Sequence, residues 1–290
     1  MTEQQPLPPG YSLGAMTDAD VETLVSWARA EGWNPGASDV AIIRAVDPDA
    51  FIALRDGDEL VGGGTILRVA PNLGFMGLFI VRPDRRSQGL GRVLWHHRRD
   101  LLLSRLEPGA SIGMDGVYSM ADFYARGGFR TAYRDIRYEG PAAGTVDPDV
   151  VGLDSLDREE IYRLDADLLG ADRRQILERW ITAPGVRVAG LLSEGRLVAF
   201  GVLRPTHVGF RFGPVLADDV GLARRVLSHL MAPIAGEQVQ LDVPEVNEPG
   251  VALALEHGWR EAFGCARMYH GPAPDIDPRR VFGVTSFEFG

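Results

Sequence analysis

A long apolar run that leads through a glycine-bearing turn into an amphipathic helix constrains the fold of this 290-residue chain more than any other feature. The run, GFMGLFIV at residues 74–81, has no charged side chain and is typical of a strand buried on both faces. In the following LGRVLWHHRRDLLLSRL, apolar side chains recur three and four residues apart, which predicts a helix from residue 90 onward. A buried strand followed at once by a helix predicts an α/β protein.

The turn between this strand and this helix, RPDRRSQG, predicts an anion-binding site. The first turn of a helix leaves backbone N–H groups unpaired and carries the positive end of the helix dipole. Gly89 and Gly91 let an anion approach the backbone, while Arg86 and Arg92 add positive charge beside it. The turn has neither the GKS or GKT of a nucleoside triphosphate loop nor the third glycine of a dinucleotide motif. We therefore expect a different phosphate-bearing ligand.

The order of predicted elements in the first half of the chain recurs in the second half. Each half has a helical opening, then a hairpin, a strand, a helix, a strand, a short helix and a further strand. The stretch between the halves, GPAAGTVDPD at residues 140–149, is rich in glycine, proline and alanine and shows no periodicity. We predict two units, residues 1–140 and residues 141–290, that duplicate one α/β fold. The closing VFGVTSFEFG predicts a last strand, because apolar residues alternate with small or polar ones.

The stretch FIVRPDRRSQGLGRVL resembles the signature of the GCN5-related N-acetyltransferases, the GNAT family. Arg86, Gly89 and Gly91 stand at the motif positions, and the order of the surrounding elements agrees over about residues 10–140. The resemblance implies tandem GNAT folds of class α/β (α+β), each a mixed, mostly antiparallel sheet flanked by helices. It also implies acetyl-CoA as the cofactor. The residues implied to bind it are Phe79, Ile80 and Val81 at the pantetheine, and Arg86, Ser87, Gln88, Gly89, Leu90, Gly91 and Arg92 at the pyrophosphate.

Tyr124 is the catalytic residue that the resemblance implies. The family usually places a tyrosine five residues before the phenylalanine of a Gly-Phe pair, and Tyr124 stands in that register before Gly128 and Phe129. Its hydroxyl would protonate the coenzyme A thiolate as the thiolate departs. The alternative interpretation is a half-buried helix aromatic beside Phe123, and the motif upstream favours the acid.

Two features of the family pattern are missing from this chain. Many relatives carry an asparagine that contacts the cofactor where this chain has Val117, and residues 74–81 contain no Asp or Glu to act as a base. The base could instead be Asp115, Glu31 or a water held by main-chain carbonyls. Each of these carboxylates is also typical of a turn or a helix end, so the alternatives stay open.

The acceptor side is predicted at EGWNPG, where this fold usually lines the acceptor pocket. Trp33 and Asn34 either bind substrate there or close the helix with a buried aromatic, and Asp115 is a further candidate for substrate binding. No metal site is predicted: the adjacent His96 and His97 lack the i, i+4 spacing of a metal-binding pair, and the chain has only one cysteine.

The second unit lacks the residues that would make an anion site at the corresponding turn. Its FGPVLADDVGLARRVL has Asp218 and Asp219 where the first unit has arginine and serine, and only Gly221 where two glycines are needed. Two carboxylates would repel a pyrophosphate. Ala254 stands at the position of the catalytic tyrosine. We expect a degenerate GNAT-like domain that closes the acceptor pocket, stabilises the first domain or mediates assembly into a homo-oligomer.

These residues predict an N-acetyltransferase that moves the acetyl group of acetyl-CoA to a primary amine by direct attack in a ternary complex. The alternative is a non-catalytic acyl-CoA-binding sensor or assembly protein, which the missing carboxylate base supports. The acceptor partner is a small-molecule or peptide amine. A net charge of −10 argues against nucleic acid, because phosphate backbones are held by clustered Lys and Arg. No signal peptide or apolar stretch of membrane-span length is present, which predicts a cytoplasmic protein without a membrane partner.

Overall fold

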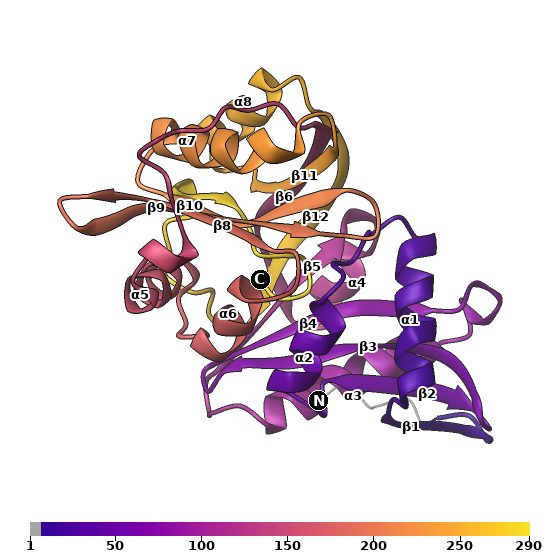
Figure 1. Ribbon diagram of the computed structural model, residues 1–290. Coiled ribbons are helices and arrows are strands. Elements are labelled where there is room, and N and C mark those ends of the chain that lie inside the picture. The colour runs from indigo at the N-terminus through magenta and orange to yellow at the C-terminus, as the bar shows by residue number, and fades with distance from the viewer. Residues whose placement is uncertain (1–6) are drawn as a thin grey trace.

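The computed structural model describes residues 7–290, in which strands from both halves of the chain form one continuous 13-stranded sheet with helices packed against it (Figure 1). The elements of the first half are β1 (Tyr11–Ala15), α1 (Asp18–Ala30), α2 (Asp39–Val46), β2 (Phe51–Asp56), β3 (Glu59–Ala70), β4 (Leu73–Val81), α3 (Leu90–Ser104), β5 (Ser111–Val117), α4 (Ala121–Arg126) and β6 (Phe129–Pro141). The elements of the second half are β7 (Val151–Gly152), α5 (Arg158–Leu169), α6 (Arg174–Ile181), β8 (Arg187–Ser193), β9 (Arg196–Pro205), β10 (Phe210–Ala217), α7 (Val220–Met231), β11 (Gln238–Pro244), α8 (Glu248–Glu256), β12 (Arg260–His270) and β13 (Val281–Gly283).

Local sequence signals account for the ends of these elements. Helix α1 begins after Thr17, whose hydroxyl accepts from the N–H of Asp20 at 3.2 Å while the Asp20 carboxylate accepts from the N–H of Thr17 at 2.8 Å. This reciprocal pair satisfies two free donors of the first helical turn. Between β8 and β9, Glu194 and Gly195 both have positive φ, as a tight hairpin turn requires. The last strand is shorter than predicted, because β13 ends at Gly283 and the chain continues without regular structure.

The two halves exchange strands at the centre of the sheet. The strand order is β1-β2-β3-β4-β5-β12-β6-β11-β10-β9-β8-β7, and β13 pairs with β10. Strand β12 of the second half therefore lies between β5 and β6 of the first half, and β6 pairs in turn with β11. All pairs are antiparallel except β4 with β5 and β10 with β11. A boundary near residue 140 divides the chain but not the sheet.

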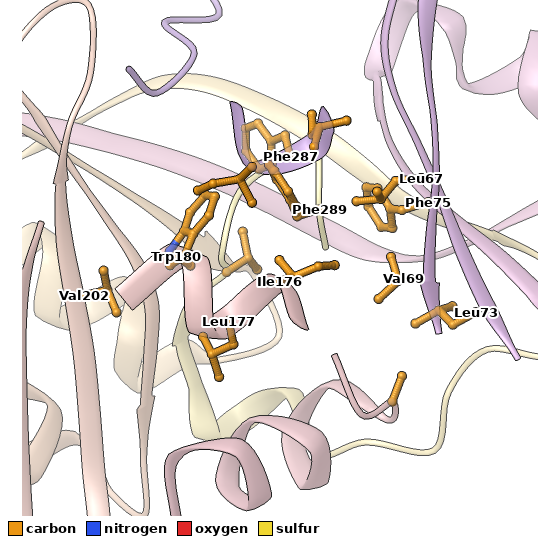
Figure 2. Close-up of a cluster of buried hydrophobic side chains, with 14 of the residues drawn as sticks. Leu67, Val69, Leu73, Phe75, Ile176, Leu177, Trp180, Val202, Phe287 and Phe289 are labelled. Atoms are coloured by element: carbon orange, nitrogen blue, oxygen red, sulfur yellow. The ribbon is translucent and has the colours of Figure 1, made fainter. Parts of the chain in front are cut away.

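One of the hydrophobic clusters joins the two halves. It combines Leu67 and Phe75 of the first half with Trp180 of α6, and with Phe287 and Phe289 of the C-terminal segment (Figure 2). The Trp180 ring lies 5.0 Å from that of Phe289, and its Nε1 donates to the carbonyl of Gly213 at 2.7 Å. The segment after β13 is thus packed between the halves, which places it beside the first half's strands.

Candidate active site

A cavity of about 770 Å³ lies where the parallel strands β4 and β5 diverge. Their pairing runs from Leu73 with Ser111 to Met76 with Met114 and then ends. Beyond this point Leu78 has φ of 50°, a left-handed conformation that few residues other than glycine adopt. The backbone of β4 from Gly77 onward is therefore bent away from β5, and both strands line the cavity.

Arg98 of the helix α3 supports this bend by hydrogen bonds to the strands β3 and β4. Its side chain is fully buried, and Nη2 donates to the carbonyls of Thr65 at 2.5 Å and of Gly77 at 2.7 Å. Gly64 leaves room for the guanidinium, since a Cβ there would lie 2.4 Å from its central carbon. Burial lowers the pKa of Arg98 to about 9, although nearby Tyr124 opposes this shift. The sequence pattern did not reveal this arginine, because it lies on the side of α3 that faces the sheet.

The glycine-bearing turn lies at one end of the cavity. Gly89 caps α3 with φ of 81°, and Ser87 has φ of 64°. A Cβ on Gly91 would make only ordinary contacts, at 3.5 Å to Val81 and 3.6 Å to Phe79. The predicted cofactor residues that line the cavity are Phe79, Ile80, Val81, Arg86, Ser87, Gly89, Gly91 and Arg92.

The other two predicted cofactor residues lie differently. Leu90 packs into the hydrophobic core beneath α3, so only its main chain faces the turn. The side chain of Gln88 is exposed and donates to the carbonyl of Asp84 at 3.3 Å. Arg86 donates from Nε to the carbonyl of Val81 at 2.8 Å and from Nη2 to Glu31 at 2.6 Å. The arginine and its carboxylate partner both line the cavity.

Tyr124 projects from α4 into the same cavity. Its side chain is buried, and a Cβ on Gly116 of β5 would lie 2.5 Å from its ring. Burial raises the pKa of Tyr124 to about 12, while Arg98 opposes the shift. The phenol therefore keeps its proton at neutral pH. A protonated hydroxyl close to the divergent strands is able to act as an acid.

The structure separates the predicted acceptor residues. Trp33 lines the cavity, but Asn34 turns toward the second half. The Asn34 amide donates to Thr206 and Gln240, both at 3.0 Å, and its oxygen accepts from the N–H of Val208 at 2.9 Å. These hydrogen bonds join the segment between α1 and α2 to the β9–β10 hairpin and to β11, so Asn34 holds the halves together.

Asp115 lines the cavity but is already engaged. Both of its carboxylate oxygens accept from Arg267 of β12, at 2.7 and 2.8 Å. Burial raises the pKa of Asp115, while Arg267 opposes the shift. Because both carboxylate oxygens already accept from a buried guanidinium, Asp115 is poorly placed to bind an acceptor amine.

Residues of the second half complete the cavity wall, and the sequence did not point to them. They are Phe263 and Cys265 of β12 with Phe287 and Glu288 of the C-terminal segment. The only local signal was the isolated carboxylate in the apolar SFEFG. Within residues 7–290, no group of three or more His, Cys, Asp and Glu could hold a metal ion, and no helix is long and apolar enough to cross a membrane.

The corresponding region of the second half is closed by the chain itself. Strands β10 and β11 pair from Phe210 with Val239 to Phe212 with Leu241, and β13 then pairs with β10. A Cβ on Gly283 of β13 would lie 2.7 Å from Leu241, so the space is filled. At the helix that follows, Asp219 accepts from the N–H of Leu222 at 2.9 Å. Its carboxylate occupies the helix N-terminus where the first half has its glycine-bearing turn.

Comparison with protein families matches both halves of the chain. The acetyltransferase (GNAT) family model matches residues 18–129, and an acetyltransferase (GNAT) domain model matches residues 161–283. The chain belongs to the GNAT acetyltransferase family. This GNAT protein is an acyltransferase, and members of its family use acyl-CoA. The GNAT family predicted from the glycine-bearing turn is confirmed.

Similar proteins agree with a tandem GNAT arrangement. The GNAT chain is 26% identical to holothin acyltransferase of Pseudoalteromonas sp. (strain SANK 73390) over 268 residues, which cover 91% of this chain and 89% of that relative. An inferred acetyltransferase from Pyrococcus horikoshii has a TM-score of 0.82 at 21% identity, covering 100% of this chain and 99% of that one. A tandem GNAT protein from the clavulanic acid biosynthesis pathway has a TM-score of 0.62 at 18% identity. The match covers 91% of this chain and 99% of that one. The predicted fold class is confirmed.

Proposed function

We propose that this protein transfers the acetyl group of acetyl-CoA to a primary amine by direct attack in a ternary complex. The observation that carries the proposal is the single cavity, which connects the glycine-bearing turn, the divergent strands and Tyr124 with an acidic and aromatic wall. In this proposal residues 1–140 form the catalytic unit, and residues 141–290 form a degenerate unit that closes the acceptor side.

The residues at the turn fit coenzyme A. The left-handed φ of Gly89 and the lack of a side chain at Gly91 leave backbone N–H groups accessible to a pyrophosphate. Arg92 adds a cation on the first turn of α3, and Arg86 lies at the entrance of the cavity. The unpaired edge of β4 at Phe79–Val81 would bind the pantetheine arm by its main chain. Bound there, acetyl-CoA supplies the acetyl thioester.

Tyr124 then acts as the acid. The amine nitrogen forms a bond to the carbonyl carbon and gives up one N–H proton to a base or water in the cavity. The carbon–sulfur bond breaks, and the sulfur takes the proton of the Tyr124 hydroxyl, which is restored from solvent. Burial keeps that proton in place until negative charge develops on sulfur beside it. Main-chain N–H groups of the bent β4 polarise the carbonyl, which stabilises the charge that develops on its oxygen.

The cavity wall indicates which acceptors fit. Trp33, Phe263 and Phe287 offer aromatic surface, and Glu31, which is paired with Arg86, and Glu288 offer carboxylates. We infer a small primary amine with a planar or apolar body, since aromatic walls bind such a body and carboxylates attract a cation. The relative named holothin acyltransferase supports acyl transfer as the reaction of this cavity.

The test uses the purified full-length chain. Calorimetry measures the affinity for coenzyme A, and thiol release from acetyl-CoA is followed with benzylamine, aniline, an amino sugar and a lysine peptide as acceptors. Mass spectrometry identifies the acetylated product. We expect Tyr124→Phe to bind coenzyme A normally and to lose about 10²-fold or more in kcat. Coenzyme A binding without turnover of any acceptor would instead indicate an acyl-CoA sensor.

A further inference from the structure

Glu288 is a buried acidic residue of the C-terminal segment that lines the cavity. Its side chain is 4% exposed, it lines the cavity together with Tyr124, and its Oε2 has no hydrogen-bond partner. An unpaired carboxylate oxygen at such a buried position is costly for stability. A group retained at that cost in a reaction cavity is a candidate for a chemical role.

Glu288 lies at the point where the sheet opens. A Cβ on Gly77 of β4 would lie 3.1 Å from the Cα of Glu288 and 3.4 Å from its Cβ. Gly77 directly follows Met76, the last residue of β4 that pairs with β5, and precedes the bend at Leu78. Strand β4 itself carries no Asp or Glu. The absence of a side chain at Gly77 therefore lets the backbone of the C-terminal segment pass close to β4 at Glu288.

Charged groups lie near Glu288, but none of those described forms an ion pair with it. Asp39 of α2 and burial both raise its pKa, while Arg211 of β10, Arg204 of β9 and the hydroxyl of Ser286 lower it, and the net shift is upward. Arg204 is paired with Asp39 at 2.7 Å, and Arg211 donates to the carbonyls of Trp33 and Asn34. Among residues 7–290, these cations have other partners, and none lies within ion-pair distance of Glu288.

We propose that Glu288 is the general base of the transfer, supplied by the C-terminal segment in place of the carboxylate that β4 lacks. The inference rests on the proposed acetyl transfer to an amine. As the nitrogen forms its bond to the carbonyl carbon, one N–H proton passes to the Glu288 carboxylate, directly or through one water. The carbon–sulfur bond breaks, and the sulfur takes the Tyr124 proton. The two residues thus exchange one proton each with the reactants, and charge balances.

The experiment compares Glu288→Gln, Glu288→Asp and the exposed control Glu237→Gln in the full-length chain. Coenzyme A affinity is measured by calorimetry, and kcat and KM are measured across pH with acetyl-CoA and with benzylamine or aniline. These acceptors differ widely in basicity. A change in kcat that has the same pH midpoint with both acceptors therefore reports an ionisation of the enzyme and not of the amine. Thermal unfolding checks that each variant is folded.

We expect Glu288→Gln to bind coenzyme A as the unaltered protein does and to lose about 10²-fold or more in kcat. The acceptor-independent fall in kcat toward acid pH should disappear with it, because the group that must lose a proton is gone. Glu288→Asp should recover part of kcat and keep that fall, and Glu237→Gln should change neither. A folded Glu288→Gln variant that retains both kcat and the acid fall overturns the role of Glu288 while leaving acetyl transfer intact. An unaltered protein that acetylates no acceptor overturns both.

Discussion

The buried ion pair between Arg137 of β6 and Asp242 of β11 offers a quantitative test of how the two halves are joined. Nε and Nη2 of the arginine donate to the two carboxylate oxygens at 2.6 and 2.8 Å, and the side chains are 2% and 0% exposed. Nη1 also donates to the carbonyl of Trp33 at 2.9 Å. Replacing Arg137 by Met removes all three hydrogen bonds and leaves a buried carboxylate.

The expected cost follows from that burial. Breaking a buried pair by removing one partner costs about 3 to 5 kcal/mol, because the remaining charge has no compensation. Arg211 lies 3.9 Å from Asp242 and retains its own bond to the Trp33 carbonyl, so we expect the lower end, about 3 kcal/mol. The double variant Arg137→Met with Asp242→Leu removes both charges and should recover most of this loss.

The pH dependence of the variant gives a second signature. Burial pushes the pKa of Asp242 upward, but Arg137 and Arg211 outweigh it and hold the pKa below its usual range. In the unaltered protein this pair therefore stabilises the fold above the unfolded pKa of Asp, and the contribution is lost as pH falls through the folded pKa. Without Arg137 burial dominates and the folded pKa rises above the unfolded one. The free energy of unfolding of Arg137→Met should then fall as pH rises between the two values.

Urea unfolding of the single and double variants measures the coupling energy of the pair. The matched control is Glu245→Gln, which removes the exposed pair between Arg134 of β6 and Glu245, the residue directly after β11, at 3.1 Å. We expect that control to cost less than about 1 kcal/mol. The reasoning is refuted if Arg137→Met and the control Glu245→Gln lose equal stability. It is also refuted if the double variant is as unstable as Arg137→Met alone.

Two further predictions concern the cavity. Gly91→Asp should weaken coenzyme A binding at least about tenfold in calorimetry, since a carboxylate at the first turn of α3 repels the pyrophosphate, whereas Gly221→Asp at the corresponding helix of the second half should leave the affinity unchanged. Gly116→Ala should cost about 1 to 3 kcal/mol in urea unfolding and lower kcat, because its Cβ would lie 2.5 Å from the Tyr124 ring. Gly14→Ala, which has nothing within 4 Å of its Cβ, is the control for both measurements, and an equal effect of both alanines would contradict the packing argument.

Local sequence signals were sufficient for the elements and for one end of the site. Three features each depend on residues within one strand-turn-helix unit. They are the glycine-bearing turn, Tyr124 in α4, and Asp219, which replaces the glycines at the corresponding turn of the second half. Backbone conformation and capping are decided over such short distances, since φ at Gly89 and the hydrogen bond to Asp219 involve neighbours in the chain. For this reason the sequence alone predicts the fold class and the family.

The rest of the site depends on contacts between segments that are remote in sequence. Asn34 lies next to Trp33 in the chain, yet it bonds to Thr206, while Glu288 reaches Gly77. No periodicity in the sequence predicts that β12 inserts between β5 and β6, or that the C-terminal segment passes from β10 to the first half's cavity. Strand order and the path of a buried segment are decided by which apolar faces and charges meet across the whole fold. The sequence by itself therefore determined the elements and the glycine-bearing turn, and the tertiary structure alone decided which aromatic and carboxylate side chains from remote segments line the cavity beside that turn.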